Sequence, residues 1–132
     1  MTSASETTTD TSARVRTAVT AALDRKARNL RVLHLGPVSD FTDYFLICSG
    51  NSQRQVQAIS DAVLEALKKQ RVRPLHVEGQ QGGNWVLLDY GDLVVHVFQP
   101  EPREFYALER LWSDAPDETG KFAEDEALGS SD

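Results

Sequence analysis

The sequence predicts a single α/β domain with a mixed sheet, in the element order α-β-β-α-β-β-β-α. Three observations support this fold class. Two segments, 13–29 and 52–70, carry apolar residues at helical spacing. Residues 44–48 form an unbroken apolar run, which is typical of a strand buried on both faces. Residues 85–98 carry aliphatic side chains at alternate positions on both sides of a turn, which is typical of a hairpin with one face in the core.

Turn and capping signals set the limits of the first four elements. Thr11 or Ser12 can cap the first helix by accepting hydrogen bonds from its free N–H groups, and Asn51 or Ser52 can cap the second. Gly36-Pro37 ends a short strand, because this pair favours a turn. The predicted elements are a helix over 13–29, strands over 31–35 and 44–48, and a second helix that ends near residue 70.

Glycine and proline divide the second half of the chain. Gln80-Gln81-Gly82-Gly83 is a loop between two strand candidates, and Tyr90-Gly91 joins the arms of the hairpin. Pro100 and Pro102 open a final helix, because proline is tolerated in the first helical turn. The predicted elements are strands over 75–78, 85–89 and 92–98 and a helix over 100–112.

The two ends of the chain differ in composition from the middle. Residues 1–12 are rich in Ser and Thr, and residues 113–132 hold seven acidic side chains against Lys121 alone. Such segments bury too little apolar surface to offset the entropy of ordering, so we expect both tails to be disordered. The predicted folded domain is residues 13–112.

Composition excludes several classes of protein. A net charge of -6 over 132 residues argues against coating of DNA or RNA, which needs clustered Lys and Arg. A single cysteine excludes an internal disulfide. The chain has no apolar run long enough to span a membrane, and its polar start lacks the features of a signal peptide. We therefore expect a cytoplasmic protein without membrane contact.

The two faces of the hairpin have different characters when Tyr90-Gly91 is read as a two-residue loop. One face is wholly aliphatic and belongs to the core: Val86, Leu88, Leu93, Val95 and Val97. The other face pairs Trp85 with His96, Leu87 with Val94, and Asp89 with Asp92. Apolar side chains on this second face favour a partner-binding surface. Two opposed carboxylates would repel each other, and this favours a basic partner. The alternative is that the final helix covers the face and buries the tryptophan.

Sites for catalysis or metal binding are not expected. Asp89 and Asp92 are a candidate Mg²⁺ pair, and the turn 49–52 is a candidate phosphate site at a helix start, but the chain contains no Asp-x-Asp motif. The three histidines, His34, His76 and His96, show no metal-ligand spacing with the one cysteine, Cys48. A basic cluster after the second helix complements the helix dipole, with RNA contact as the alternative: Lys68, Lys69, Arg71 and Arg73.

Four blocks of sequence follow one another along the predicted domain. They are 41–52 (FTDYFLICSGNS), 76–79 (HVEG), 85–98 (WVLLDYGDLVVHVF) and 103–112 (REFYALERLW). Together they resemble the ribosomal silencing factor family, also called the Iojap family, over residues 13–112. The resemblance implies a nucleotidyltransferase-like fold that lacks the catalytic carboxylates, and therefore no enzyme activity and no cofactor.

The resemblance also implies a function. Proteins of this family bind the large ribosomal subunit through ribosomal protein uL14 and block joining of the small subunit. They repress translation when nutrients are short. For this chain we expect the same role, with at most peripheral contact to rRNA. The expected partner-binding residues are Trp85, Leu87, Asp89, Tyr90, Asp92, Val94, His96, Phe98 and Tyr106.

Two other classes of function stay open at this point. A nucleotidyltransferase-like enzyme would bind nucleotides with Mg²⁺. A homodimeric structural module would bury the apolar hairpin face against a second copy of the chain.

Overall fold

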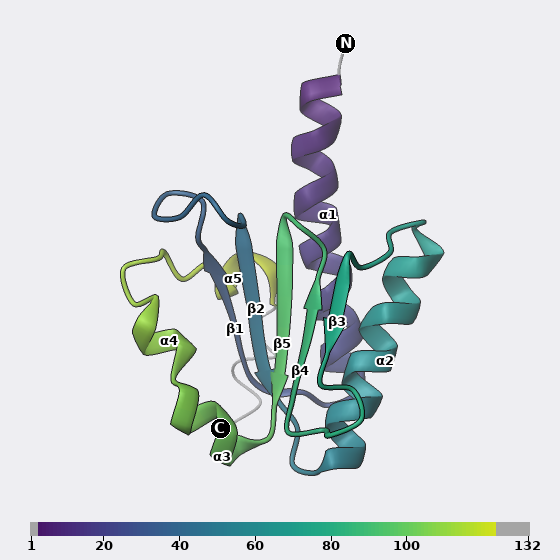
Figure 1. Cartoon of the computed structure of the whole chain (residues 1–132). Coiled ribbons are helices and arrows are strands. Elements are labelled where there is room, and N and C mark those ends of the chain that lie inside the picture. The colour runs from purple at the N-terminus through teal and green to yellow at the C-terminus, as the bar shows by residue number, and fades with distance from the viewer. Residues whose placement is uncertain (1–2, 124–132) are drawn as a thin grey trace.

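The sheet of this domain has five strands of mixed direction (Figure 1). The computed structural model describes the backbone of residues 3–123 and the side chains of residues 11–104 and 107–123. The strand order is β1-β2-β5-β4-β3. Strands β2 and β5 run parallel, and the other neighbours are antiparallel. The predicted α/β fold with a mixed sheet and flanking helices is therefore confirmed.

The elements follow the predicted order, except that the predicted final helix is divided in two and a further short helix lies near the C-terminus. The strands are β1 Arg28–His34, β2 Tyr44–Ser49, β3 His76–Glu78, β4 Trp85–Asp89 and β5 Leu93–Phe98. The helices are α1 Ser3–Asp24, α2 Gln53–Lys69, α3 Pro100–Tyr106, α4 Leu108–Leu111 and α5 Thr119–Phe122. None of the helices within residues 3–123 has the length and apolar character needed to cross a membrane.

Helices α1 and α2 pack on one face of the sheet, which we call the inner face (Figure 1). The core lies between these helices and the sheet. It contains the predicted aliphatic face of the hairpin, whose five residues have no exposed surface: Val86, Leu88, Leu93, Val95 and Val97. Helices α3 and α4 lie beside the β1 end of the sheet in Figure 1. The opposite face, which we call the outer face, is therefore not covered by a full helical layer.

The cross-strand pairs predicted for the hairpin are wrong by two residues. Trp85 lies opposite Phe98, and Leu87, rather than Trp85, lies opposite His96. Side chains alternate along a strand with a period of two, so this shift changes the pairs but leaves the residues of the two strands, 85–89 and 93–98, on their predicted faces.

The hairpin loop explains the shift. Tyr90 N–H donates to the carbonyl of Leu93 over 2.8 Å, so the two loop residues are Gly91 and Asp92. Gly91 has φ +91°, the left-handed conformation that a tight hairpin requires at its first loop position. Glycine adopts this conformation without strain, whereas a loop at Tyr90-Gly91 would impose it on tyrosine.

The segment 113–123 folds against β1, where the sequence predicted the start of a disordered tail. Val32 N–H donates to Thr119 Oγ1 over 2.9 Å, and Phe122 is only 8% exposed. These contacts also cover the free edge of β1, which would otherwise present unpaired backbone groups. The remainder of the predicted tail, residues 124–132, lies outside the described residues.

Two helices differ from their predicted limits. Helix α1 begins at Ser3, within the segment 1–12 that was expected to be disordered, and residues 1 and 2 lie outside the described residues. It ends before Lys26, which has φ +63° and so cannot continue a right-handed helix. The predicted final helix divides into α3 and α4 because Ala107 adopts the left-handed conformation, with φ +49°.

Asp92 connects the hairpin loop to α1. Thr11 Oγ1 donates to Asp92 Oδ2 over 2.8 Å, and Arg14 Nη1 donates to the same oxygen over 3.1 Å. Asp92 therefore belongs to the α1 side of the domain and does not form the predicted acidic pair with Asp89 on the outer face. The reason is again the register, because Asp92 is a loop residue and not part of β5.

We expect Asp92→Ala to lower the free energy of unfolding by about 1–2 kcal/mol, because it removes a charge-assisted link between α1 and the hairpin. The side chains of Arg14 and Asp92 are 30% and 21% exposed, so solvent screening keeps the effect in this modest range. Urea unfolding followed by circular dichroism measures it. The matched control is Asp40→Ala, which removes an exposed carboxylate. Equal stability of the two variants would contradict the prediction.

Candidate partner-binding surface

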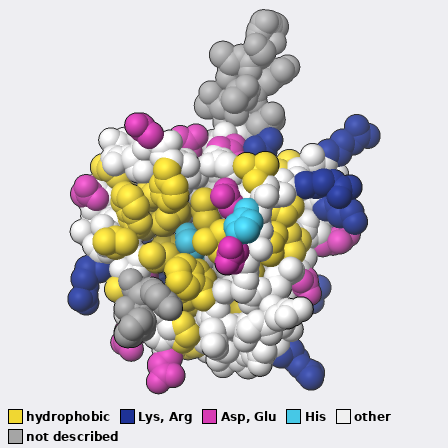
Figure 2. Space-filling model, in the orientation of Figure 1, with side chains coloured by type: hydrophobic (Ala, Val, Ile, Leu, Met, Phe, Trp, Pro, Cys, Tyr) yellow, Lys and Arg dark blue, Asp and Glu magenta, His cyan; other side chains and the backbone are white. Residues whose placement is uncertain are grey.

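The outer face of β4 carries the residues around which the sequence predicted a docking site. Trp85, Leu87 and Asp89 alternate along this strand, and each is half-buried. We call them the β4 surface. Val94 and His96 of the neighbouring β5 lie next to this surface and are buried, with 5% and 3% of their area exposed. Figure 2 shows apolar side chains gathered over this side of the molecule, with histidine and acidic side chains near its centre.

Two neighbours hold the Trp85 indole in place. Its ring stacks on Phe98 at a centroid distance of 4.9 Å, and its Nε1–H donates to His96 Nδ1 over 3.1 Å. The His96 ring in turn packs edge-on against Phe45 at 4.5 Å. The indole is therefore fixed in one orientation while it stays partly exposed, and the final helix does not bury it.

Burial changes the acid–base behaviour of His96. Loss of hydration lowers the pKa of His96 to about 3, so the ring is neutral at pH 7. Because Nδ1 accepts the bond from Trp85, the ring proton lies on Nε2. That atom is buried and has no hydrogen-bond partner among the described groups. His96 therefore orients the indole from below and is not itself exposed to a partner.

Other predicted contact residues lie away from the surface. Phe98 has no exposed area and belongs to the apolar cluster beneath the outer face. Tyr90 is a correction: it lies on the inner face, 5% exposed, because it follows Leu88 with the period of the strand. Burial raises the pKa of the Tyr90 hydroxyl to about 12. Helix α3 ends at Tyr106, whose side chain lies outside the described ones, so its predicted contact is untested.

The edge of the β4 surface next to β3 is rich in ionisable groups. His76 lies opposite Asp89, and His76 Nε2 is 2.6 Å from Glu78 Oε2. Asp89 Oδ1 accepts a hydrogen bond from Gly91 N–H over 2.8 Å, which orients its carboxylate. The apolar residues of the β4 surface, Trp85 and Leu87, therefore have an acidic border formed by Asp89 and Glu78. A polar rim of this kind usually surrounds the apolar centre of an interface.

The apolar area extends to residues that the sequence analysis did not single out as contacts. Phe41 and Leu111 are 61% and 68% exposed. The Phe41 ring stacks on Trp112 at 6.1 Å and meets Phe45 edge-on at 5.9 Å. A signal for Phe41 was present in the sequence, since it is a large apolar residue in the connection between two strands, outside any core pattern.

The turn 49–52 serves the fold in this structure. Ser52 Oγ accepts from Gln55 N–H over 3.1 Å and caps α2, as the sequence predicted. Ser49 Oγ accepts from Arg103 Nη1 over 2.8 Å, and the same guanidinium is paired with Glu109. Both serines of the turn therefore act within the fold, and neither is arranged around a phosphate.

The described side chains form neither a metal-binding cluster nor an accessible thiol. Among residues 11–104 and 107–123, no three His, Cys, Asp or Glu side chains lie together as metal ligands do. Cys48 has no exposed surface, and burial raises the pKa of its thiol to about 12. The cysteine therefore acts as a small core residue, in agreement with its place in the apolar run 44–48 that predicted a buried strand.

Comparison with known proteins gives one consistent result. The family model described as ribosomal silencing factor during starvation matches residues 8–131. A ribosomal silencing factor from Halalkalibacterium halodurans is 44% identical over 99 residues, which are 75% of this chain and 85% of that protein. One from Bacillus subtilis is 42% identical over 99 residues, with 75% and 84% covered. The mouse protein named mitochondrial assembly of ribosomal large subunit protein 1 is 36% identical over 90 residues, with 66% and 40% covered.

Solved structures agree with this result. A crystal structure of a protein from Chromobacterium violaceum superposes with a TM-score of 0.74 at 34% identity and covers 76% of this chain and 83% of its own. A structure from Bacillus halodurans gives a TM-score of 0.66 at 43% identity, with 72% and 89% covered. The chain therefore belongs to the ribosomal silencing factor family.

Proposed function

We propose that this protein is a cytoplasmic translational repressor that binds the large ribosomal subunit through ribosomal protein uL14. A protein bound at that position would sterically prevent the small subunit from joining. Family membership supports the ribosomal role, and the outer face of the sheet supports the mode of binding.

The observation that carries the mode of binding is the partly exposed, fixed indole of Trp85. Tryptophan is enriched among the few residues that supply most of the binding energy of an interface. The stack on Phe98 and the hydrogen bond to His96 hold the ring before any partner arrives. Little conformational entropy is then lost on binding, and this raises affinity. Leu87 adds apolar area beside the ring.

The acidic border of the β4 surface favours a basic partner. Asp89 and Glu78 present carboxylates at this edge, and the chain carries a net charge of -6. Proteins that bind rRNA carry many Lys and Arg side chains to neutralise phosphates. A ribosomal protein can therefore offer cations to these carboxylates in charge-assisted hydrogen bonds. The same acidic border disfavours direct contact with rRNA, so any such contact is peripheral.

A homodimer through the outer face is the second candidate, and the exposed Phe41 and Leu111 favour it. A dimer that buried the β4 surface would compete with ribosome binding, because both partners would use the same indole. Mass in solution at high concentration distinguishes the two: a strict monomer removes the dimer.

The test of the proposed function is a sucrose gradient with purified subunits. The protein is added to separated large and small subunits at a Mg²⁺ concentration that promotes joining. We expect it to sediment with the large subunit and to reduce the joined particle. Sedimentation only at the top of the gradient, with an unchanged joined peak, would refute the proposal.

A further inference from the structure

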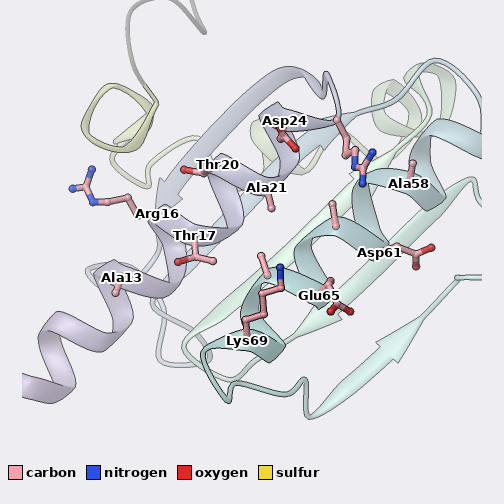
Figure 3. Close-up of a pocket in the computed structure, with 13 residues that line it drawn as sticks. Ala13, Arg16, Thr17, Thr20, Ala21, Asp24, Ala58, Asp61, Glu65 and Lys69 are labelled. Carbon is pink, nitrogen blue, oxygen red and sulfur yellow. The ribbon is translucent and has the colours of Figure 1, made fainter.

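A groove of about 1010 Å³ runs between α1 and α2 on the outside of the helical layer (Figure 3). Small side chains line much of it, including Ala21 of α1 and Ala58 and Ala62 of α2. In Figure 3, Ala13 and Lys69 lie toward one end of the groove. Small residues along two facing helices leave room for an apolar side chain from elsewhere.

The described part of the chain ends beside this pair of helices. Phe122 and Ala123 are 8% and 3% exposed and belong to the inner core cluster with α1. The guanidinium carbon of Arg16 lies 5.2 Å from the centre of the Phe122 ring. Arg16 also lines the groove. One exposed side chain of α1 therefore connects the end of the described chain with the groove.

We propose that residues 124–132 cross α1 at Arg16 and insert Leu128 into the groove between α1 and α2. The order of residues in this segment agrees with this path. The acidic residues Glu124, Asp125 and Glu126 come first, and the apolar residues Ala127 and Leu128 follow. The carboxylates meet the guanidinium during the crossing, and the two apolar side chains reach the groove. The proposal does not depend on ribosome binding.

The length of the segment fits the distance to be crossed. An α-helix with its side chains is about 10–12 Å wide. An extended chain advances about 3.3 Å per residue, so four residues cover about 13 Å. Residues 124–127 are therefore enough to cross α1, and Leu128 is the first residue expected within the groove.

The charges around the groove favour its Ala13 end. The groove is lined by three basic and three acidic side chains: Arg16, Arg25, Lys69, Asp24, Asp61 and Glu65. Arg16 lies where the segment crosses, and Lys69 lies toward the same end as Ala13 (Figure 3). Asp24 lies toward the opposite end and would repel the acidic residues. Glu65 lies next to Lys69 in Figure 3, so Arg16 is the cation that attracts the acidic residues, at the point where they cross α1.

Disulfide cross-linking in the full chain tests the placement. Ala62→Cys is combined with Leu128→Cys, and the control pair combines Leu128→Cys with Arg54→Cys, an exposed position on α2 outside the groove. We expect the Ala62 pair to form an intramolecular disulfide at least tenfold faster than the control, because docking raises the local concentration of one thiol at the other. The buried Cys48 does not compete. Equal rates, or a cross-link only between two copies, would overturn the proposal.

A measurement without new cysteines guards against distortion by the cross-link. Nuclear magnetic resonance compares the full chain with a chain that ends at Ala123 and with the full-length Arg16→Glu variant. Removal of the segment is expected to shift the amide signals of Ala58, Ala62 and Ala66, and Arg16→Glu to reproduce part of that shift. Unchanged signals at all three positions in the truncated chain would overturn the proposal.

Discussion

Trp85→Ala is expected to weaken binding to the large ribosomal subunit by about 2–4 kcal/mol, which corresponds to about thirtyfold or more in the dissociation constant. The variant removes the largest apolar side chain of the β4 surface and the group around which its neighbours are arranged. Binding of labelled protein to isolated large subunits, measured over a range of concentrations, gives the change directly.

Because the indole also bonds to His96, the variant needs two controls. Thermal unfolding shows how far the loss of this contact weakens the fold, and binding is measured well below the transition. Leu75→Ser is the matched surface control, since Leu75 is 75% exposed and its side chain lies near Gly91 rather than on the β4 surface. Binding of Trp85→Ala as tight as that of Leu75→Ser would show that the docking surface lies elsewhere.

The elements of this fold could be predicted where local chemistry decides them. The unbroken apolar run of β2, the cap at Ser52 and the aliphatic face of the hairpin all have the predicted positions. In each case the determinant lies within a few residues: a period of two, a side-chain oxygen at a helix start, or an unbroken run of apolar residues. The half-burial of Trp85 beside a polar rim also follows from the alternation along β4.

The features that could not be predicted depend on contacts between distant segments. Asp92 was paired with Asp89 from the assumed loop, whereas Arg14, 78 residues away, binds it in the structure. The segment 113–123 was read as a disordered tail, because its composition does not reveal that Thr119 and Phe122 meet β1 and β2. Composition reports the apolar content of a segment but not the partner that covers it.

The second large effect concerns stability and pH. Burial lowers the pKa of His96 to about 3, below its ordinary value of about 6.5. The unfolded chain therefore binds a proton at this ring between pH 6.5 and pH 3, while the folded protein does not. The contribution of His96 to stability is complete above pH 6.5 and decreases as the pH falls through this window. By linkage, about 2 kcal/mol is lost between pH 7.5 and pH 5.

His96→Gln isolates this contribution, because glutamine does not titrate and its side-chain oxygen can still accept the hydrogen bond from the Trp85 indole. Glutamine packs less well than histidine against Phe45, and this lowers the stability of the variant at every pH. The informative quantity is therefore the change in unfolding free energy between the two pH values. Urea unfolding at pH 7.5 and pH 5 is expected to show a loss about 2 kcal/mol smaller in the variant than in the unaltered protein. An equal loss in both would mean that the ring takes up its proton without unfolding. In that case the buried, neutral imidazole is not what holds the indole in place.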